Sequence, residues 1–109
     1  MLVSNTDDHL RNHGFILVPG KGWRLSEAYD MNPVPDSHGL KLNVSEVDNV
    51  MDLDLARAVA SYFRIAAKAA NEIIERSQSI VRQWRKIAAQ LVIPAREQER
   101  IASAFRLAE

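Results

Sequence analysis

Glycine and proline are divided unequally along this chain of 109 residues, and their placement constrains the fold more than any other feature. All four glycines and three of the four prolines lie in residues 1–50, whereas residues 52–109 contain no glycine and only Pro94. Both residue types interrupt helices and supply turns. The first half should therefore be irregular with short strands, and the second half should be helical. This pattern predicts an α+β protein that is mostly α-helical.

A short β-hairpin is predicted near the start of the chain. Residues 14–18 and 22–25 form two mainly apolar stretches, and the sequence Pro-Gly-Lys-Gly between them at 19–22 is typical of a tight turn. Pro33 and Pro35 exclude regular structure immediately afterwards. Residues 40–44 are a candidate for a third short extended stretch.

About three helices are expected between residues 52 and 106. Asp52 or Asp54 can cap a first helix that continues to about residue 62. A second, long helix is expected over 65–91, and Pro94 suits the first turn of a third. The long helix has apolar residues at steps of three, four or seven, which place them on one face: Ile65, Ala69, Ile73, Ile80, Trp84, Ile87 and Leu91. The third helix should bury Ile101, Ala104 and Phe105.

Composition and charge exclude several classes of protein. The chain has no cysteine, no apolar run near ~18 residues, and no basic and apolar start of the kind that directs secretion, so we expect a cytoplasmic protein with no membrane span. Its formal net charge of zero is split, since residues 1–49 have seven acidic and four basic side chains, and residues 50–109 have seven and ten. The basic excess between Arg76 and Arg106 is more typical of a solvated helix face than of a nucleic-acid surface.

Three polar residues have the spacing of a phosphoryl-transfer site. Asp7 and Asn12 reproduce the D-x-x-x-x-N interval of a kinase catalytic loop, and Asp30 follows the predicted hairpin. Mg²⁺ prefers oxygen ligands, which the Asn12 amide and the Asp30 carboxylate can provide, while Asp7 can accept a proton from a hydroxyl group. A hairpin that folds back should bring Asp30 beside Asn12.

These motifs carry a family resemblance that extends over essentially the whole chain. Residues 6–12, Thr-Asp-Asp-His-Leu-Arg-Asn, fit the pattern T-D-x-H-x-x-N, and residues 29–31, Tyr-Asp-Met, fit Y-D-x. In both, the chain resembles the C-terminal lobe of HipA-like serine/threonine kinases, the toxins of bacterial type II toxin–antitoxin systems. The resemblance implies that Asp7 is the catalytic aspartate and that Asn12 and Asp30 bind Mg²⁺ and, through it, ATP. It also implies a protein substrate and an antitoxin partner, with DNA contacted only through that antitoxin.

The sequence also departs from such kinases. It has no glycine-rich phosphate loop, and Lys21, Lys41, Lys68 and Lys86 all follow the catalytic loop, so none matches the lysine that clamps the phosphates. We therefore interpret residues 1–109 as one partial domain, with the catalytic loop and hairpin in 1–50 and a helical bundle in 51–109. Alone it should not phosphorylate at a useful rate. Exposed apolar surface near the N-terminus should be covered by a missing N-terminal lobe or by a second copy.

Two other functions stay open at this point. The chain could be a non-catalytic toxin remnant that binds an antitoxin or associates with itself. Alternatively, His9 and His13, four residues apart, could join Asp7 or Asp8 in a small metal-dependent hydrolase, with His38 as a distant ligand. The pattern is not H-E-x-x-H, and His9 is better interpreted as a structural residue of the loop. Asp7 and Asp8 could also only cap a turn.

Overall fold

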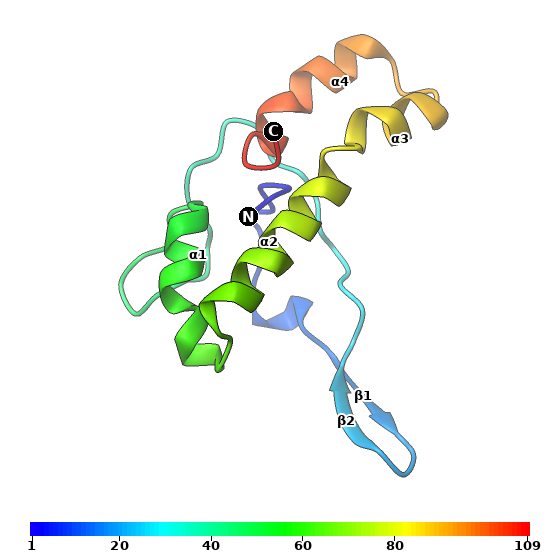
Figure 1. Cartoon of the computed structure of the whole chain (residues 1–109). Coiled ribbons are helices and arrows are strands. Elements are labelled where there is room, and N and C mark those ends of the chain that lie inside the picture. The colour runs from blue at the N-terminus through cyan, green and yellow to red at the C-terminus, as the bar shows by residue number, and fades with distance from the viewer.

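A computed structural model describes residues 1–109 as a helical body from which a β-hairpin projects (Figure 1). The hairpin pairs β1 (Phe15–Val18) with β2 (Gly22–Leu25) in antiparallel register, so that Phe15 faces Leu25 and Val18 faces Gly22. Gly20 and Gly22 have φ of 73° and 88°, a left-handed conformation that glycine adopts without steric cost. The hairpin predicted from the turn sequence is confirmed.

The second half is helical, as the absence of glycine predicts. It contains α1 (Leu53–Val59), α2 (Ala67–Val81), α3 (Trp84–Gln90) and α4 (Ala95–Ile101), and short 3-10 turns follow α1 and α4. The Asp52 side chain caps α1 by accepting a hydrogen bond from the Asp54 backbone at 2.8 Å. The α+β, mostly helical fold class is therefore confirmed. Residues 40–44 form no strand, and a single bridge between Gly39 and Val50 is the nearest extended pairing.

The helix expected over 65–91 is present as two helices. It is interrupted at Arg82 and Gln83, where neither glycine nor proline occurs. Trp84, the first residue after the interruption, is buried in the core. Tertiary packing therefore overrides local helix propensity at this point. The predicted apolar face is consequently not a buried one: of its seven members only Trp84 is buried, and the large side chains of Ile73, Ile80, Ile87 and Leu91 are exposed.

The core lies where the end of the chain meets α3. Its buried residues are Trp84, Ala88, Ala104 and Phe105, and the Trp84 and Phe105 rings stack with their centroids 4.3 Å apart. Ala104 and Phe105 are buried as the sequence predicts. Val3, near the start of the chain, packs against the same cluster. The Ser4 hydroxyl donates to the Ala104 carbonyl, and Figure 1 shows the two termini near one another.

The chain is loosely packed for its length. Only 12 of its 109 residues are buried. The radius of gyration is 15.5 Å, compared with about 13 Å for a compact domain of this size. The projecting hairpin contributes to this extension (Figure 1). None of the helices combines the length and apolar character that crossing a membrane requires.

Candidate metal site

Asn12 and Asp30 meet at the base of the hairpin. Asn12 ends a short 3-10 turn, Leu10–Asn12, and is 8% exposed. Its Nδ2 donates a hydrogen bond of 2.6 Å to Asp30 Oδ2, across 18 residues of chain. The hairpin is the reason for this contact, because its two strands return the chain to the loop from which they leave. The structure thus brings together the two residues that the sequence pairs as metal ligands.

Asp30 is held in an unusual backbone conformation. Its φ is 56°, in the left-handed region that non-glycine residues adopt at a cost in strain. Asn32 Nδ2 donates to the second carboxylate oxygen, Oδ1, at 2.8 Å. The neighbouring Tyr29 hydroxyl donates to the Arg11 carbonyl at 2.9 Å, which fixes this segment against the loop. The carboxylate direction is therefore set by several contacts.

A further asparagine, Asn5, belongs to the same cluster. It is 7% exposed, and its Nδ2 donates to the backbone carbonyl of Asp30 at 3.3 Å. Asn5 Oδ1 and Asn12 Oδ1 are both buried without a hydrogen-bond partner. Such orphaned acceptors are rare in folded proteins. Sequence analysis did not single out Asn5, although it lies two residues before Asp7.

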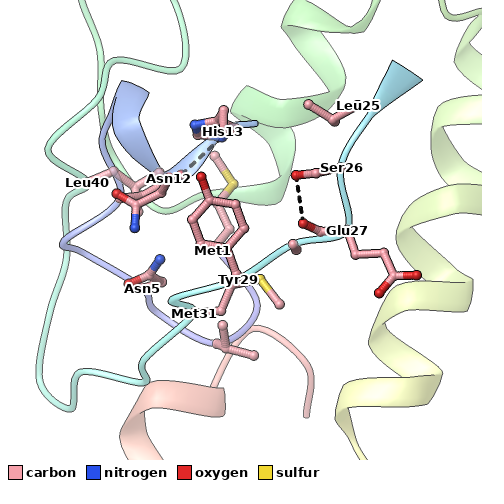
Figure 2. A pocket seen from close by; sticks show the side chains of 13 residues that line it. Met1, Asn5, Asn12, His13, Leu25, Ser26, Glu27, Tyr29, Met31 and Leu40 are labelled. Atoms are coloured by element: carbon pink, nitrogen blue, oxygen red, sulfur yellow. Dashed lines mark hydrogen bonds and ion pairs between the residues drawn. The ribbon is translucent and has the colours of Figure 1, made fainter. Parts of the chain in front are cut away.

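Both asparagines line a pocket with a volume of about 260 Å³. Figure 2 shows their side chains on one wall of this pocket, with Tyr29 and Met31 nearby. The pocket is lined by residues of the segment 5–13 and by Leu25 to Glu27 at the end of β2. Both asparagines contact Asp30 through Nδ2 and leave Oδ1 without a partner. Carboxylate and amide oxygens are ligands of the kind that Mg²⁺ prefers.

Asp7 lies apart from this pair. Its side chain is 65% exposed and forms an ion pair with Lys41, which lies in the irregular segment after Pro33 and Pro35. The hydrogen bond from Lys41, followed by the positive charge of the same group, lowers the pKa of the Asp7 carboxyl below its ordinary value of 3.8. Asp7 is therefore ionised at neutral pH. Lys41 follows the predicted catalytic loop in the sequence, so it was not matched to the lysine that clamps the phosphates. Nothing in the sequence predicted its ion pair with Asp7.

The histidines do not form a transition-metal centre. His13 Nε2 lies 3.8 Å from Asp8 Oδ2, and His13 Nδ1 lies 3.2 Å from the His9 carbonyl. No group of three or more His, Cys, Asp or Glu side chains is placed to hold a metal ion. The metal-dependent hydrolase interpretation therefore finds no ligand set in the structure.

Comparison with known proteins identifies the family. The model of the HipA-like C-terminal domain matches residues 1–84, a span that includes the loop, the hairpin, Asp30 and the first two helices. Comparisons with curated proteins and with solved structures gave no match. Because the match covers most of the chain and contains both motifs, this protein belongs to the HipA-like C-terminal domain family.

Proposed function

We propose that this chain supplies the catalytic aspartate and the Mg²⁺-binding residues of a HipA-like protein serine/threonine kinase, of the kind that acts as a toxin. Asp7 would accept the proton of the substrate hydroxyl, and Asn12 and Asp30 would hold the ion that accompanies ATP. The observation that carries the proposal is the hydrogen bond of 2.6 Å between Asn12 and Asp30. It joins the two motifs that the family pattern requires to act together.

The residues present fit a magnesium ion. Asp30 offers a carboxylate, and the Asn12 Oδ1 atom is buried without a partner. Magnesium ions usually keep several waters and use only one or two carboxylates. Asn5 Oδ1 is a second buried amide oxygen that no protein group reaches. When bound, the ion would neutralise charge on the phosphates.

Asp7 would act mainly by orienting the substrate hydroxyl. A general base works best when its pKa lies near the operating pH. The Lys41 contact lowers the pKa of Asp7 instead, which makes it a weak base that is always ionised at neutral pH. An ionised carboxylate is a strong hydrogen-bond acceptor, so it can align the hydroxyl for transfer.

The phosphate-clamping groups would come from elsewhere. Clamp and positioning groups supply a large part of the rate in phosphoryl transfer. Since these 109 residues contain no glycine-rich phosphate loop, we expect no useful phosphorylation by this chain alone. A second lobe, in the same protein or another, would complete the site.

Metal binding tests the proposal directly. Titration of the chain with Mn²⁺, a paramagnetic substitute for Mg²⁺, should broaden the NMR signals of Asn12 and Asp30 first. Asp30→Asn should weaken this binding, because the carboxylate is lost. The matched control is Asp36→Asn, since Asp36 is also an exposed aspartate with a left-handed φ of 57°, but its only hydrogen bond runs from its backbone amide to Ser103, away from Asn12. Equal broadening in wild type and Asp30→Asn would contradict the proposal.

A binding role without catalysis is the second candidate. It is favoured by one face of the hairpin, where the paired side chains of Phe15 and Leu25 and of Leu17 and Trp23 are all more than half exposed. Such an apolar face is typical of a protein interaction site. An antitoxin or a second copy would be its partner. Size-exclusion chromatography of the chain with the antitoxin tests this function. Co-elution of both the wild-type chain and the Asp30→Asn variant with the antitoxin would favour it.

A further inference from the structure

Asn5 is a buried polar residue whose role the proposed mechanism does not yet use. Its side chain is more than nine-tenths buried, and its only hydrogen bond runs from Nδ2 to the backbone carbonyl of Asp30. A carbonyl oxygen can pair only with a donor, so the orientation of the amide follows from the contact itself. The Asn5 Oδ1 atom is buried and has no hydrogen-bond partner.

The contact falls on the strained residue of the site. Asp30 has a φ of 56°, and such a conformation persists only where the surroundings hold it. Asn12 and Asn32 bond the carboxylate of Asp30, whereas Asn5 bonds its backbone. Among the side chains, Asn5 is therefore the one that fixes the peptide from which the carboxylate projects.

Asn5 is itself attached to a rigid point. The preceding residue, Ser4, is fully buried, and its Oγ donates to the Ala104 carbonyl at 2.7 Å. The Arg106 guanidinium donates to the same Oγ at 3.3 Å, and the Val34 amide donates to the Ser4 carbonyl at 3.2 Å. A residue can position another only when its own backbone is held. Ser4 meets this condition for Asn5.

We propose that Asn5 is a positioning residue: by holding the Asp30 carbonyl it maintains the left-handed turn and aims the Asp30 carboxylate at Asn12. The effect of Asn5 on metal binding rests on the proposed function. Its effect on the position of the Asp30 carboxylate does not. Asn5 does not touch the substrate hydroxyl or replace either ligand. Groups that orient metal ligands in this way typically change metal affinity by about 10- to 100-fold when they are removed.

The side-chain amide of Asn12 reports this arrangement without any metal. In the wild-type chain its bond to the Asp30 carboxylate should shift one amide proton downfield and slow its exchange with water. Asn5→Ala should abolish both effects, although Asn5 makes no hydrogen bond to Asn12. The matched control is Asn43→Ala, because Asn43 Nδ2 also donates to a backbone carbonyl at 3.3 Å, that of Glu46, away from the site. This control should leave the Asn12 signal unchanged.

Mn²⁺ titration of the same variants provides the second measurement. Asn5→Ala and Asn5→Asp, which keeps the size but removes the donor, should each raise the apparent Kd by about 10-fold or more. If wild type shows no selective broadening by Mn²⁺, the metal proposal fails, while the metal-free Asn12 signal still decides the role of Asn5. A folded Asn5→Ala variant with an unchanged Asn12 amide would overturn the inference. Loss of the whole fold in both Asn5 variants, with Asn43→Ala folded, would also overturn it by showing a general structural role.

Discussion

Single ion pairs and hydrogen bonds decide the chemistry of this site. Asp7 has one partner, Lys41, and the pair is largely exposed to solvent. Asp30 has three asparagines around it, at distances of 2.6 to 3.3 Å. The pKa of Asp7 is thus lowered mainly by Lys41, whereas the Asp30 carboxylate is held by several hydrogen bonds.

The pKa of Asp7 should respond to removal of Lys41. We expect Lys41→Gln to raise it towards its ordinary value of 3.8, since the hydrogen bond and the charge are both lost. NMR titration of the carboxyl carbon measures this change. Lys21→Gln, which alters a hairpin-turn lysine, is the control and should leave the pKa of Asp7 unchanged. An Asp7 pKa that is the same in Lys41→Gln and wild type would contradict the structure.

The same ion pair gives a pH dependence of stability. Because the folded-state pKa of Asp7 is lowered, the pair stabilises the fold above the unfolded value of 3.8 and loses this effect as pH falls through the folded pKa. The pair is exposed, so salt should reduce the effect. Urea unfolding below and above pH 4 at low salt should show a smaller pH effect for Lys41→Gln than for wild type. Equal pH effects would count against the pair.

Residue-scale contacts could be predicted only where the chain order constrains them. The pairing of Asn12 with Asp30 follows from a loop, a hairpin and an aspartate in succession. Lys41 meets Asp7 across 34 residues, and Asn5 meets Asp30 across 25. Irregular segments carry these contacts, and they have no periodicity that would place their side chains. The contact between Asn12 and Asp30 could therefore be predicted from the sequence, whereas the contacts of Lys41 and Asn5 could not.

Elements differ in how far local sequence determines their ends. The hairpin and the start of α1 are specified locally, by a Gly-containing turn and by the Asp52 cap. The end of α2 is not, because residues 82–83 have no helix-breaking type. There the stacking of Trp84 on Phe105, and hydrogen bonds from Gln78 and Arg82 to the carbonyls of the last residues, determine where the helix ends.

The cap of α1 should make a measurable contribution to stability. Asp52→Ala removes the acceptor for the Asp54 amide, and we expect a loss of about 1 kcal/mol in the free energy of unfolding. Asp52→Asn keeps an acceptor at the same place and should change the free energy of unfolding by only a few tenths of a kcal/mol. Urea denaturation of the two variants makes the comparison. A loss of similar size in both would show that the cap is not the cause.

The stacked tryptophan, Trp84, should contribute far more to stability than the exposed one, Trp23. Trp84 is 8% exposed and Trp23 is 70% exposed. We expect Trp84→Ala to lower the free energy of unfolding by about 3 to 5 kcal/mol, and Trp23→Ala to change it by less than about 0.5 kcal/mol. Thermal unfolding followed by circular dichroism distinguishes them. A smaller loss in Trp84→Ala than in Trp23→Ala would contradict the assignment of the core.

The molecule as a whole has a small core and a contiguous exposed apolar surface. One face of the projecting hairpin presents Phe15, Leu17, Trp23 and Leu25 to solvent. Exposed apolar residues are normal when scattered singly, but a contiguous face is not. The sequence predicts such a surface near the N-terminus, and its location on the hairpin follows from strand register.

This face should cause association in dilute solution. We expect sedimentation velocity to show a sedimentation coefficient that rises with concentration, and the paired substitutions Leu17→Lys and Trp23→Lys to suppress the rise. Val47→Lys and Val92→Lys together are the control, because these residues are exposed but lie outside the hairpin. A wild-type chain that stays monomeric at all concentrations, with a sharp unfolding transition, would contradict the prediction.

The hydrogen bond from Ser4 to Ala104 joins residues that are 100 positions apart. During translation the first 30 residues leave the ribosome well before Ala104 is added. Contacts of such sequence separation form late, because the loop between them must close first. Asn5, Asn12 and Asp30 therefore should not hold their final arrangement on the nascent chain. The order of synthesis would keep the site unassembled until the last residues of this segment are free to fold back.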